Sequence, residues 1–155
     1  MIEKQNVTKQ LMIENFIKIY GDGESPMVFA SPARINIIGE HIDYNGGKVF
    51  PAAIDKYLYC AIRKRNDSKI IYNDLFFPGT FTFDINDKFV FDKKNDYANF
   101  LNGILCCMKK RGLKFDAGFD CLIASNVPSA GGISSSSALD CGFAWAVNET
   151  YGINM

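Results

Sequence analysis

The sequence is poor in the side chains that hold transition metals. It contains a single histidine, and none of its five cysteines forms a Cys-x-x-Cys pair. Zinc sites are built from several Cys, His or acidic ligands, so a zinc protein is not expected. An odd number of cysteines in apolar segments also argues against a disulfide framework, and buried free thiols are expected instead. The residues concerned are Cys60, Cys106, Cys107, Cys121 and Cys141.

Excess charge and long apolar runs are absent as well. The 17 basic and 17 acidic residues cancel, which argues against a nucleic-acid-binding surface. We interpret the basic triplet 63–65 as a solvated strand end, and the triplet 109–111 as the basic end of a helix before Gly112. No apolar run approaches the length of a membrane span, and the polar residues 1–10 do not form a signal peptide. The chain is therefore expected to be cytoplasmic, without a membrane or nucleic-acid partner.

Helical and strand patterns alternate along the 155 residues, a length that fits one domain with an ordinary apolar core. We predict a mixed α/β (α+β) fold comprising residues 1–155. Short apolar or alternating runs between turn residues predict the strands. These are expected at 27–30, 34–38, 47–50, 57–64, 69–73, 80–84 and 117–125.

Three helices are expected from apolar residues spaced three and four apart. The first follows Thr8, a suitable N-cap, and ends near Tyr20; the second begins near Asp96; the third covers 139–151 and ends at Gly152. The first should bury Leu11, Met12, Phe16 and Ile19, and the second should bury Tyr97, Phe100, Leu101, Ile104, Leu105 and Met108.

A run rich in glycine and serine, residues 128–139, joins the last predicted strand to the last predicted helix. Glycine lets a backbone approach a bulky anion, the first turn of a helix has free N–H groups, and serine adds hydroxyl groups. The run therefore favours a phosphate-binding loop, and a nucleotide is the ligand class that fits best. The alternative is a turn at Gly131 and Gly132 followed by serines that only cap the helix.

The run lacks the residues of two common nucleotide motifs. A Walker A loop needs a lysine after its last glycine, where this chain has Ile133, and the G-x-G-x-x-G pattern of dinucleotide-binding folds is missing. The helix dipole, backbone amides, a metal ion or a cation from elsewhere would have to balance the phosphate charge. Arg34, in an earlier segment, is such a cation.

That earlier segment, residues 31–47, is dense in polar side chains. Arg34 and Asn36 alternate with isoleucines, so both are expected on one face of a strand. Donors and acceptors then crowd the turn after Gly39, which suits a polyhydroxylated ligand. The alternative is a polar surface loop in which Asp43 and Asn45 only stabilise turns. The crowded residues are Glu40, His41, Asp43, Tyr44 and Asn45.

Together, the two segments resemble a known family of kinases. The series Arg-x-Asn-Ile-Ile-Gly-Glu-His-x-Asp-Tyr-Asn-Gly-Gly, from Arg34 to Gly47, is similar to the galactokinase signature. The series from Pro128 to Ser136 resembles the ATP-binding motif shared by galactokinase, homoserine kinase, mevalonate kinase and phosphomevalonate kinase. The resemblance implies a fold like the second domain of ribosomal protein S5, with ATP and Mg²⁺ as cofactors. It also implies transfer of a phosphoryl group from ATP to the anomeric hydroxyl of galactose.

The resemblance further implies roles for individual residues. Arg34 corresponds to the arginine near the transferring phosphate, where its fixed charge would stabilise the transition state. The implied sugar-binding residues are Glu40, His41, Asp43 and Tyr44. The implied ATP-phosphate residues are Gly131, Gly132, Ser134, Ser135 and Ser136, and Ser136 is also the implied magnesium ligand.

In this family, the aspartate that acts on the anomeric hydroxyl lies in a later glycine-rich motif. After Ser136 the sequence has only Asp140 and Glu149 as acidic residues, both within the predicted helix. We therefore expect an N-terminal part of a galactokinase-like enzyme, which lacks the C-terminal kinase domain and is not competent by itself. The alternatives are a sugar- or nucleotide-binding regulator without turnover, and a kinase for N-acetylgalactosamine, arabinose or a uronic acid.

Overall fold

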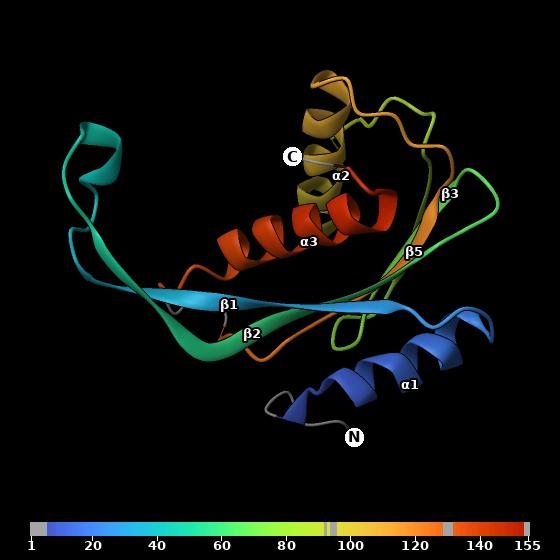
Figure 1. The fold of residues 1–155 in the computed structure, drawn as a ribbon, viewed down its shortest axis with the longest axis horizontal. Coiled ribbons are helices and arrows are strands. Elements are labelled where there is room, and N and C mark those ends of the chain that lie inside the picture. Colours follow the sequence, from blue (N-terminus) through green and yellow to red (C-terminus); the bar gives the residue numbers. More distant parts are fainter. Residues whose placement is uncertain (1–5, 92, 94–95, 129–131, 154–155) are drawn as a thin grey trace.

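A computed structural model describes residues 6–91, 93, 96–128 and 132–153. The strands are β1 (Met27–Ile38), β2 (Phe50–Lys64), β3 (Lys69–Asp74), β4 (Thr80–Asp84) and β5 (Phe119–Ser125). They form one sheet in the order β1-β2-β5-β3-β4, in which β3 and β5 are parallel and the other neighbours are antiparallel. Helix α1 (Lys9–Tyr20) lies on one face of this sheet, and α2 (Asp96–Lys110) and α3 (Ser135–Tyr151) lie on the other (Figure 1). The mixed α/β architecture predicted from the sequence is confirmed.

The central strand β5 has apolar residues on both of its faces. Phe119, Cys121 and Ile123 belong to the core beneath α2 and α3, whereas Leu122 and Ala124 belong to the core beneath α1. Successive side chains of a strand point to opposite faces, so a strand covered by helices on both sides is apolar throughout. The run predicted as a strand at 117–125 is mostly apolar in the sequence because both faces of this strand are covered by helices.

Strands β1 and β2 are each one long strand, where the sequence predicts two. No break separates 27–30 from 34–38. Instead, β1 continues through this region with a shift in its register against β2 between Pro32 and Arg34. β1 is at the edge of the sheet, where a proline is tolerated. β2 begins at Phe50 rather than at Gly47 and continues without a gap to Lys64.

Helix α1 begins as predicted. The Thr8 hydroxyl accepts a hydrogen bond from the Leu11 amide at 3.2 Å, which satisfies a free N–H group of the first turn. Met12 and Phe16 are fully buried against the sheet, but Ile19 is exposed. The burial predicted for Ile19 is wrong. The apolar residues of α1 cover a wider part of its surface than the part that contacts the sheet, and Ile19 lies outside that contact.

Helices α2 and α3 cover the other face of the sheet. Leu101, Leu105 and Met108 are buried as predicted, whereas Phe100 is half exposed. The side chain of Tyr97 is outside the part of α2 that the structure describes. Lys109 and Lys110 lie in the last turn of α2, as predicted for a basic helix end. Among the described residues, no helix is both long and apolar enough to cross a lipid bilayer.

The basic triplet 63–65 lies at the end of β2, as predicted, but only Lys64 is solvated. The carboxylate of Asp120, which is buried, lies 3.5 Å from the Arg63 guanidinium and 2.6 Å from that of Arg65. The Arg63 guanidinium also donates to the carbonyl oxygens of Tyr20 and Gly21, where α1 ends. Arg63 therefore joins the sheet to the end of α1, whereas Arg65 pairs with Asp120 and Asp67.

The cysteines are free, as expected, but only Cys60 and Cys121 are buried. The prediction of buried thiols is wrong for Cys107 and Cys141, which are exposed, and holds only in part for Cys106. Helical positions do not alternate like those of a strand, so an apolar neighbourhood in sequence does not place a helical cysteine in the core.

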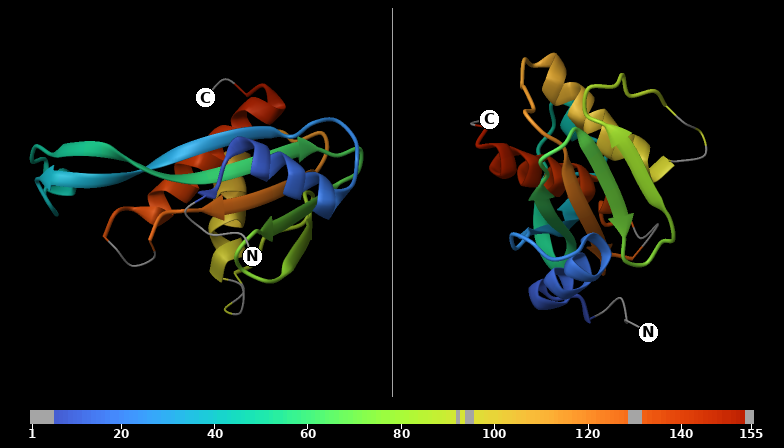
Figure 2. Two further views of the ribbon diagram at one scale, coloured as in Figure 1. Left: turned by 90° about the horizontal axis from the view of Figure 1, so that it is seen from below. Right: turned by 90° about the vertical axis from the view of Figure 1, so that its right-hand side faces the viewer.

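The outer ends of β1 and β2, with the turn between them, extend well beyond the helices (Figure 2). We call this part, residues 35–52, the arm. Several of its large apolar side chains are exposed, including Ile37, Ile38 and Phe50. The arm also carries the residues predicted to bind the sugar, Glu40, His41, Asp43 and Tyr44.

Candidate functional site

The turn of the arm has a compact backbone. Gly39 has a φ of 106°, and a Cβ atom at this position would lie 2.7 Å from the carbonyl oxygen of Lys48, so only glycine fits. The chain then forms a short 3-10 helix, η2 (Asp43–Asn45). A hydrogen bond of 2.7 Å from the Gly47 amide to the Ile42 carbonyl closes the turn. These contacts fix the positions from which the polar side chains project.

A hollow of about 130 Å³ brings most of these polar side chains together. It is lined by Arg34, Asn36, Glu40, His41, Asp43, Val49 and Pro51. We call it the polar cavity. It combines a guanidinium and an imidazole with an amide and two carboxylates, so it offers both donors and acceptors. The two apolar residues of the lining, Val49 and Pro51, were not predicted. Pro51 reaches the cavity because it pairs with Asn36 across the sheet, and this long-range pairing is not visible in the local sequence.

Tyr44, also predicted to bind the ligand, does not line the polar cavity. Its side chain is 71% exposed, and its hydroxyl lies 3.0 Å from Nδ1 of His41. The neighbouring Asn45 donates from Nδ2 to the His41 carbonyl oxygen at 3.1 Å. Both residues therefore contact His41 and not the cavity itself.

The serine-rich run forms the start of α3, one turn earlier than predicted. The Ala138 amide donates to the Ser134 carbonyl at 3.0 Å, which makes the first helical hydrogen bond. Ser134 is the N-cap, with a φ of 61°, but its hydroxyl makes no capping bond. Ser134 therefore does not cap α3 through its side chain, and first-turn N–H groups are the ones that could face an anion. Gly132 has a φ of 66°, and Gly131 is outside the described residues.

A second hollow, of about 210 Å³, lies beside this helix start. Ser135 and Ser136 line it together with three phenylalanines, Phe76, Phe77 and Phe100. Hydroxyl groups next to aromatic rings, with the carboxylate of Asp74 in the same wall, suit a ligand with one polar and one flat apolar part. The aromatic residues come from the loop after β3 and from α2, and no sequence pattern indicates their position beside the serines.

The two predicted segments meet in the structure. The Arg34 amide donates to the Ile133 carbonyl at 3.2 Å, so β1 contacts the loop that leads into α3. Arg34 lines the polar cavity and Ile133 directly precedes the N-cap of α3, so this hydrogen bond links the cavity to the helix start.

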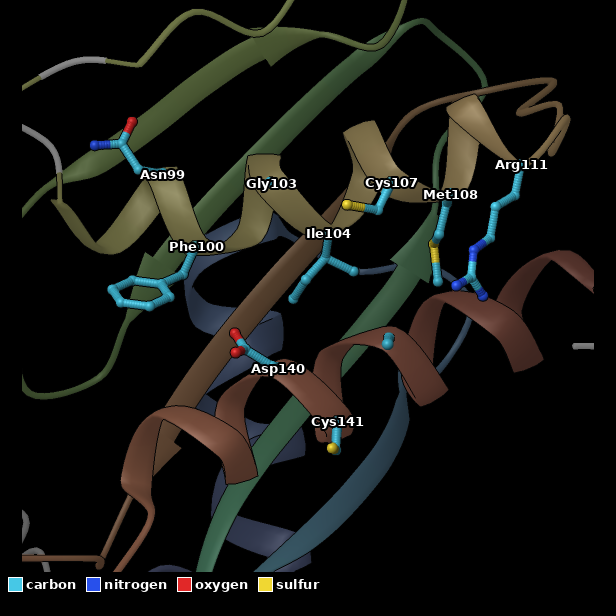
Figure 3. Close-up of a pocket in the computed structure, with 10 residues that line it drawn as sticks. Asn99, Phe100, Gly103, Ile104, Cys107, Met108, Arg111, Asp140 and Cys141 are labelled. Atoms are coloured by element: carbon cyan, nitrogen blue, oxygen red, sulfur yellow. The ribbon is translucent and has the colours of Figure 1, made fainter. Parts of the chain in front are cut away.

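A larger hollow, of about 560 Å³, lies elsewhere, between α2 and α3. Its walls are mostly apolar, and Cys107 and Cys141 project into it from the two helices (Figure 3). Burial raises the pKa of the Asp140 carboxyl at its edge above the ordinary value. None of the residues predicted to bind a ligand lines this hollow, so chemistry rather than size identifies the candidate site.

Comparison with known proteins defines the class of the fold. The family described as GHMP kinases N terminal domain matches residues 99–155. The crystal structure of Methanococcus jannaschii mevalonate kinase superimposes with a TM-score of 0.69 over 86% of this chain and 43% of that one. At 22% sequence identity this likeness shows a common fold, that of the N-terminal part of these kinases.

More specific matches identify one family within this class. The galactokinase galactose-binding signature matches residues 14–64. Galactokinase of Streptococcus suis is 39% identical over 150 residues, which are 96% of this chain and 38% of the relative. The crystal structure of Lactococcus lactis galactokinase complexed with galactose has a TM-score of 0.85 at 34% identity, over 94% of this chain and 38% of that one. The chain belongs to the galactokinase family, and it spans about two fifths of the length of these relatives.

Proposed function

We propose that this chain is the sugar- and phosphate-binding N-terminal domain of a galactokinase, which transfers the γ-phosphoryl group of ATP to the anomeric hydroxyl of galactose. The hydrogen bond from Arg34 to Ile133 carries the proposal, because it holds the polar cavity next to the start of α3. A sugar in the cavity and phosphates at the helix start would meet beside Arg34. The whole reaction is assigned to a protein of the relatives' length.

The residues of the polar cavity divide into donors and acceptors. Glu40 and Asp43, when ionised, can only accept hydrogen bonds, so they suit sugar hydroxyl groups that donate. The cationic guanidinium of Arg34 would stabilise the negative charge that spreads over the transferring phosphoryl group.

ATP fits the start of α3 in two respects. The Ser134 hydroxyl leaves the helix N-terminus uncapped, and Phe77 and Phe100 offer apolar surface for a base next to Ser135 and Ser136. Mg²⁺ usually keeps several waters and binds through few protein groups plus substrate phosphates. Ser136 would supply one such oxygen. The ion would add positive charge at the phosphates, and the other proposed contacts do not depend on it.

A cytoplasmic location is part of the proposal. All five cysteines are free, which suits a reducing compartment. The proposed partners are the sugar, ATP and the remaining part of a galactokinase-length protein.

Titration of the isolated chain with sugars tests the polar cavity. Galactose should bind weakly, and Asp43→Asn should weaken binding by about 10-fold or more, since a hydrogen bond to a charged group is lost. Asp116→Asn, at an exposed site, is the matched control and should bind like the wild type. Equal binding by the Asp43 variant would contradict the assignment. Tighter binding of N-acetylgalactosamine, arabinose or a uronic acid would assign the site to a related kinase.

Turnover tests the assignment of Arg34. In a galactokinase-length protein that contains this chain, Arg34→Ala should lower kcat by about 10²-fold or more with a smaller change in KM. Arg111→Ala, at the end of α2, is the control and should leave both unchanged. Sugar binding without any phosphorylation by the unsubstituted protein would favour the regulator instead. The isolated chain should not turn over, and robust product formation by it would contradict the need for the rest of the protein.

A further inference from the structure

Tyr44 and His41 form a side-chain pair at the rim of the polar cavity. The Tyr44 hydroxyl lies 3.0 Å from Nδ1 of His41, and the two rings meet edge to face at a centroid distance of 6.2 Å. Of these two residues, only His41 lines the polar cavity. In the described part of the chain, Tyr44 is linked to the polar cavity through its contact with the imidazole.

The hydrogen bond selects one form of the neutral imidazole. A neutral imidazole carries one N–H donor and one nitrogen that accepts. Either Nδ1–H donates to the Tyr44 oxygen, or the Tyr44 hydroxyl donates to Nδ1. An unprotonated ring nitrogen is a stronger acceptor than a phenol oxygen, which favours the second direction, with the ring proton on Nε2.

The backbone of the turn holds the pair in place. His41 has a φ of 57°, in the left-handed region that few residues other than glycine adopt. The Asn45 side chain donates to the His41 carbonyl at 3.1 Å, and the Gly47 amide donates to the Ile42 carbonyl at 2.7 Å. The imidazole is therefore oriented both by its backbone and by the hydroxyl of Tyr44.

We propose that Tyr44 is a positioning residue that keeps His41 in the Nε2–H form, so that the imidazole presents a hydrogen-bond donor to a sugar oxygen in the polar cavity. Glu40 and Asp43, when ionised, can only accept, so a donor at His41 complements them. The sugar as ligand rests on the proposed function, whereas the form of the imidazole is a property of the chain alone.

The single histidine makes this form directly measurable. Long-range ¹H–¹⁵N correlation spectra of the isolated chain would be recorded at about pH 8.5, where an ordinary imidazole is neutral. The wild type should show the Nε2–H form. Tyr44→Phe keeps the ring and removes only the hydroxyl, so it should shift the resonances toward a mixture of both forms. Tyr57→Phe, outside the turn, is the control. An Nδ1–H form in the wild type, or identical spectra for wild type and Tyr44→Phe, would overturn the proposal.

Galactose titration of the same proteins tests the contact with the sugar. Tyr44→Phe should weaken binding about 3- to 10-fold, and His41→Gln, which retains an N–H donor near the Nε2 position, should bind more tightly than His41→Leu. A changed imidazole form with unchanged galactose affinity would overturn the donor role. If the wild type binds no galactose, the proposed function fails, while the spectra still decide whether Tyr44 sets the form of His41.

Discussion

Gly142 lies in α3 at a point where the helix backbone packs directly on β1. A Cβ atom there would lie 2.7 Å from Cβ of Ser31, and neither backbone can move away without disturbing the core. Gly142→Ala should lower the free energy of unfolding by about 1–3 kcal/mol, as measured by urea denaturation. Gly103→Ala in α2 is the matched control, because nothing lies within 4 Å of its Cβ position. It should stabilise the chain by about 0.5–1 kcal/mol, and equal effects at both sites would contradict the packing of α3.

Asp120 is a buried charge that depends on two arginines. Its side chain is 4% exposed and pairs with Arg63 and Arg65. Asp120→Asn should destabilise the chain by about 3–5 kcal/mol, because two guanidinium groups lose their buried partner. Asp116→Asn removes a carboxylate that is 71% exposed, and it should change the unfolding transition little. If both variants lost a similar free energy of unfolding, the burial of Asp120 would not explain its contribution to stability.

The same residues show a limit of sequence interpretation. The triplet 63–65 looks solvated in sequence, since three consecutive basic residues are usually exposed. The pairing of β2 with β5 sets Arg63 opposite Asp120, and this long-range register decides their environment. Local composition contains no information about which strand becomes the neighbour.

At the scale of elements, the turn between β2 and β3 depends on an ion pair. Arg65 donates to both carboxylate oxygens of Asp67, at 2.7 and 2.8 Å, and these hydrogen bonds lower the pKa of Asp67 to about 2. The folded pKa is below the ordinary value of 3.8, so the contribution to stability is complete above that value and is lost as the pH falls toward 2.

Acid unfolding of Asp67→Asn checks this contribution. The wild type should lose more stability than the variant between about pH 4 and pH 2, because only the wild type takes up this proton on unfolding. Above about pH 5 the difference between the two proteins should be constant. Parallel curves throughout the acid range would contradict the lowered pKa of Asp67.

Most of the elements could be predicted because their signals are local. The Thr8 cap, the start of α2 at Asp96 and the Gly152 end of α3 depend on neighbouring residues, and the structure confirms them. The continuity of β1 through Pro32 could not be predicted. It depends on the partner strand, which accommodates the proline at a shift in register.

For the whole molecule, the sequence identified the polar residues of the site but not their arrangement. The cavity shared by Arg34, Glu40, His41 and Asp43 follows a single turn, so its members are close in sequence and could be named. The contact between Arg34 and Ile133 joins segments that are far apart, and only packing of α3 on β1 produces it. The exposed position of Tyr44 also depends on how the turn folds.

We expect the exposed arm to cause self-association of the isolated chain. β1 is an edge strand, and Ile38 and Phe50, which pair across the arm, are 70% and 62% exposed. A long edge strand with exposed apolar residues is a template for pairing with another chain. Sedimentation velocity should therefore show association that increases with concentration.

Replacing both residues by threonine, which keeps the strand propensity, should reduce this association several-fold. The free energy of unfolding should change by less than about 0.5 kcal/mol, because neither side chain is part of the core. The matched control is Val90→Thr with Phe91→Thr, which removes an equally exposed aliphatic and aromatic pair outside the arm. If the control reduces association as much as the arm variant does, general surface apolarity and not the edge of β1 is responsible. A chain that remains monomeric at all concentrations would show that the exposed arm does not pair.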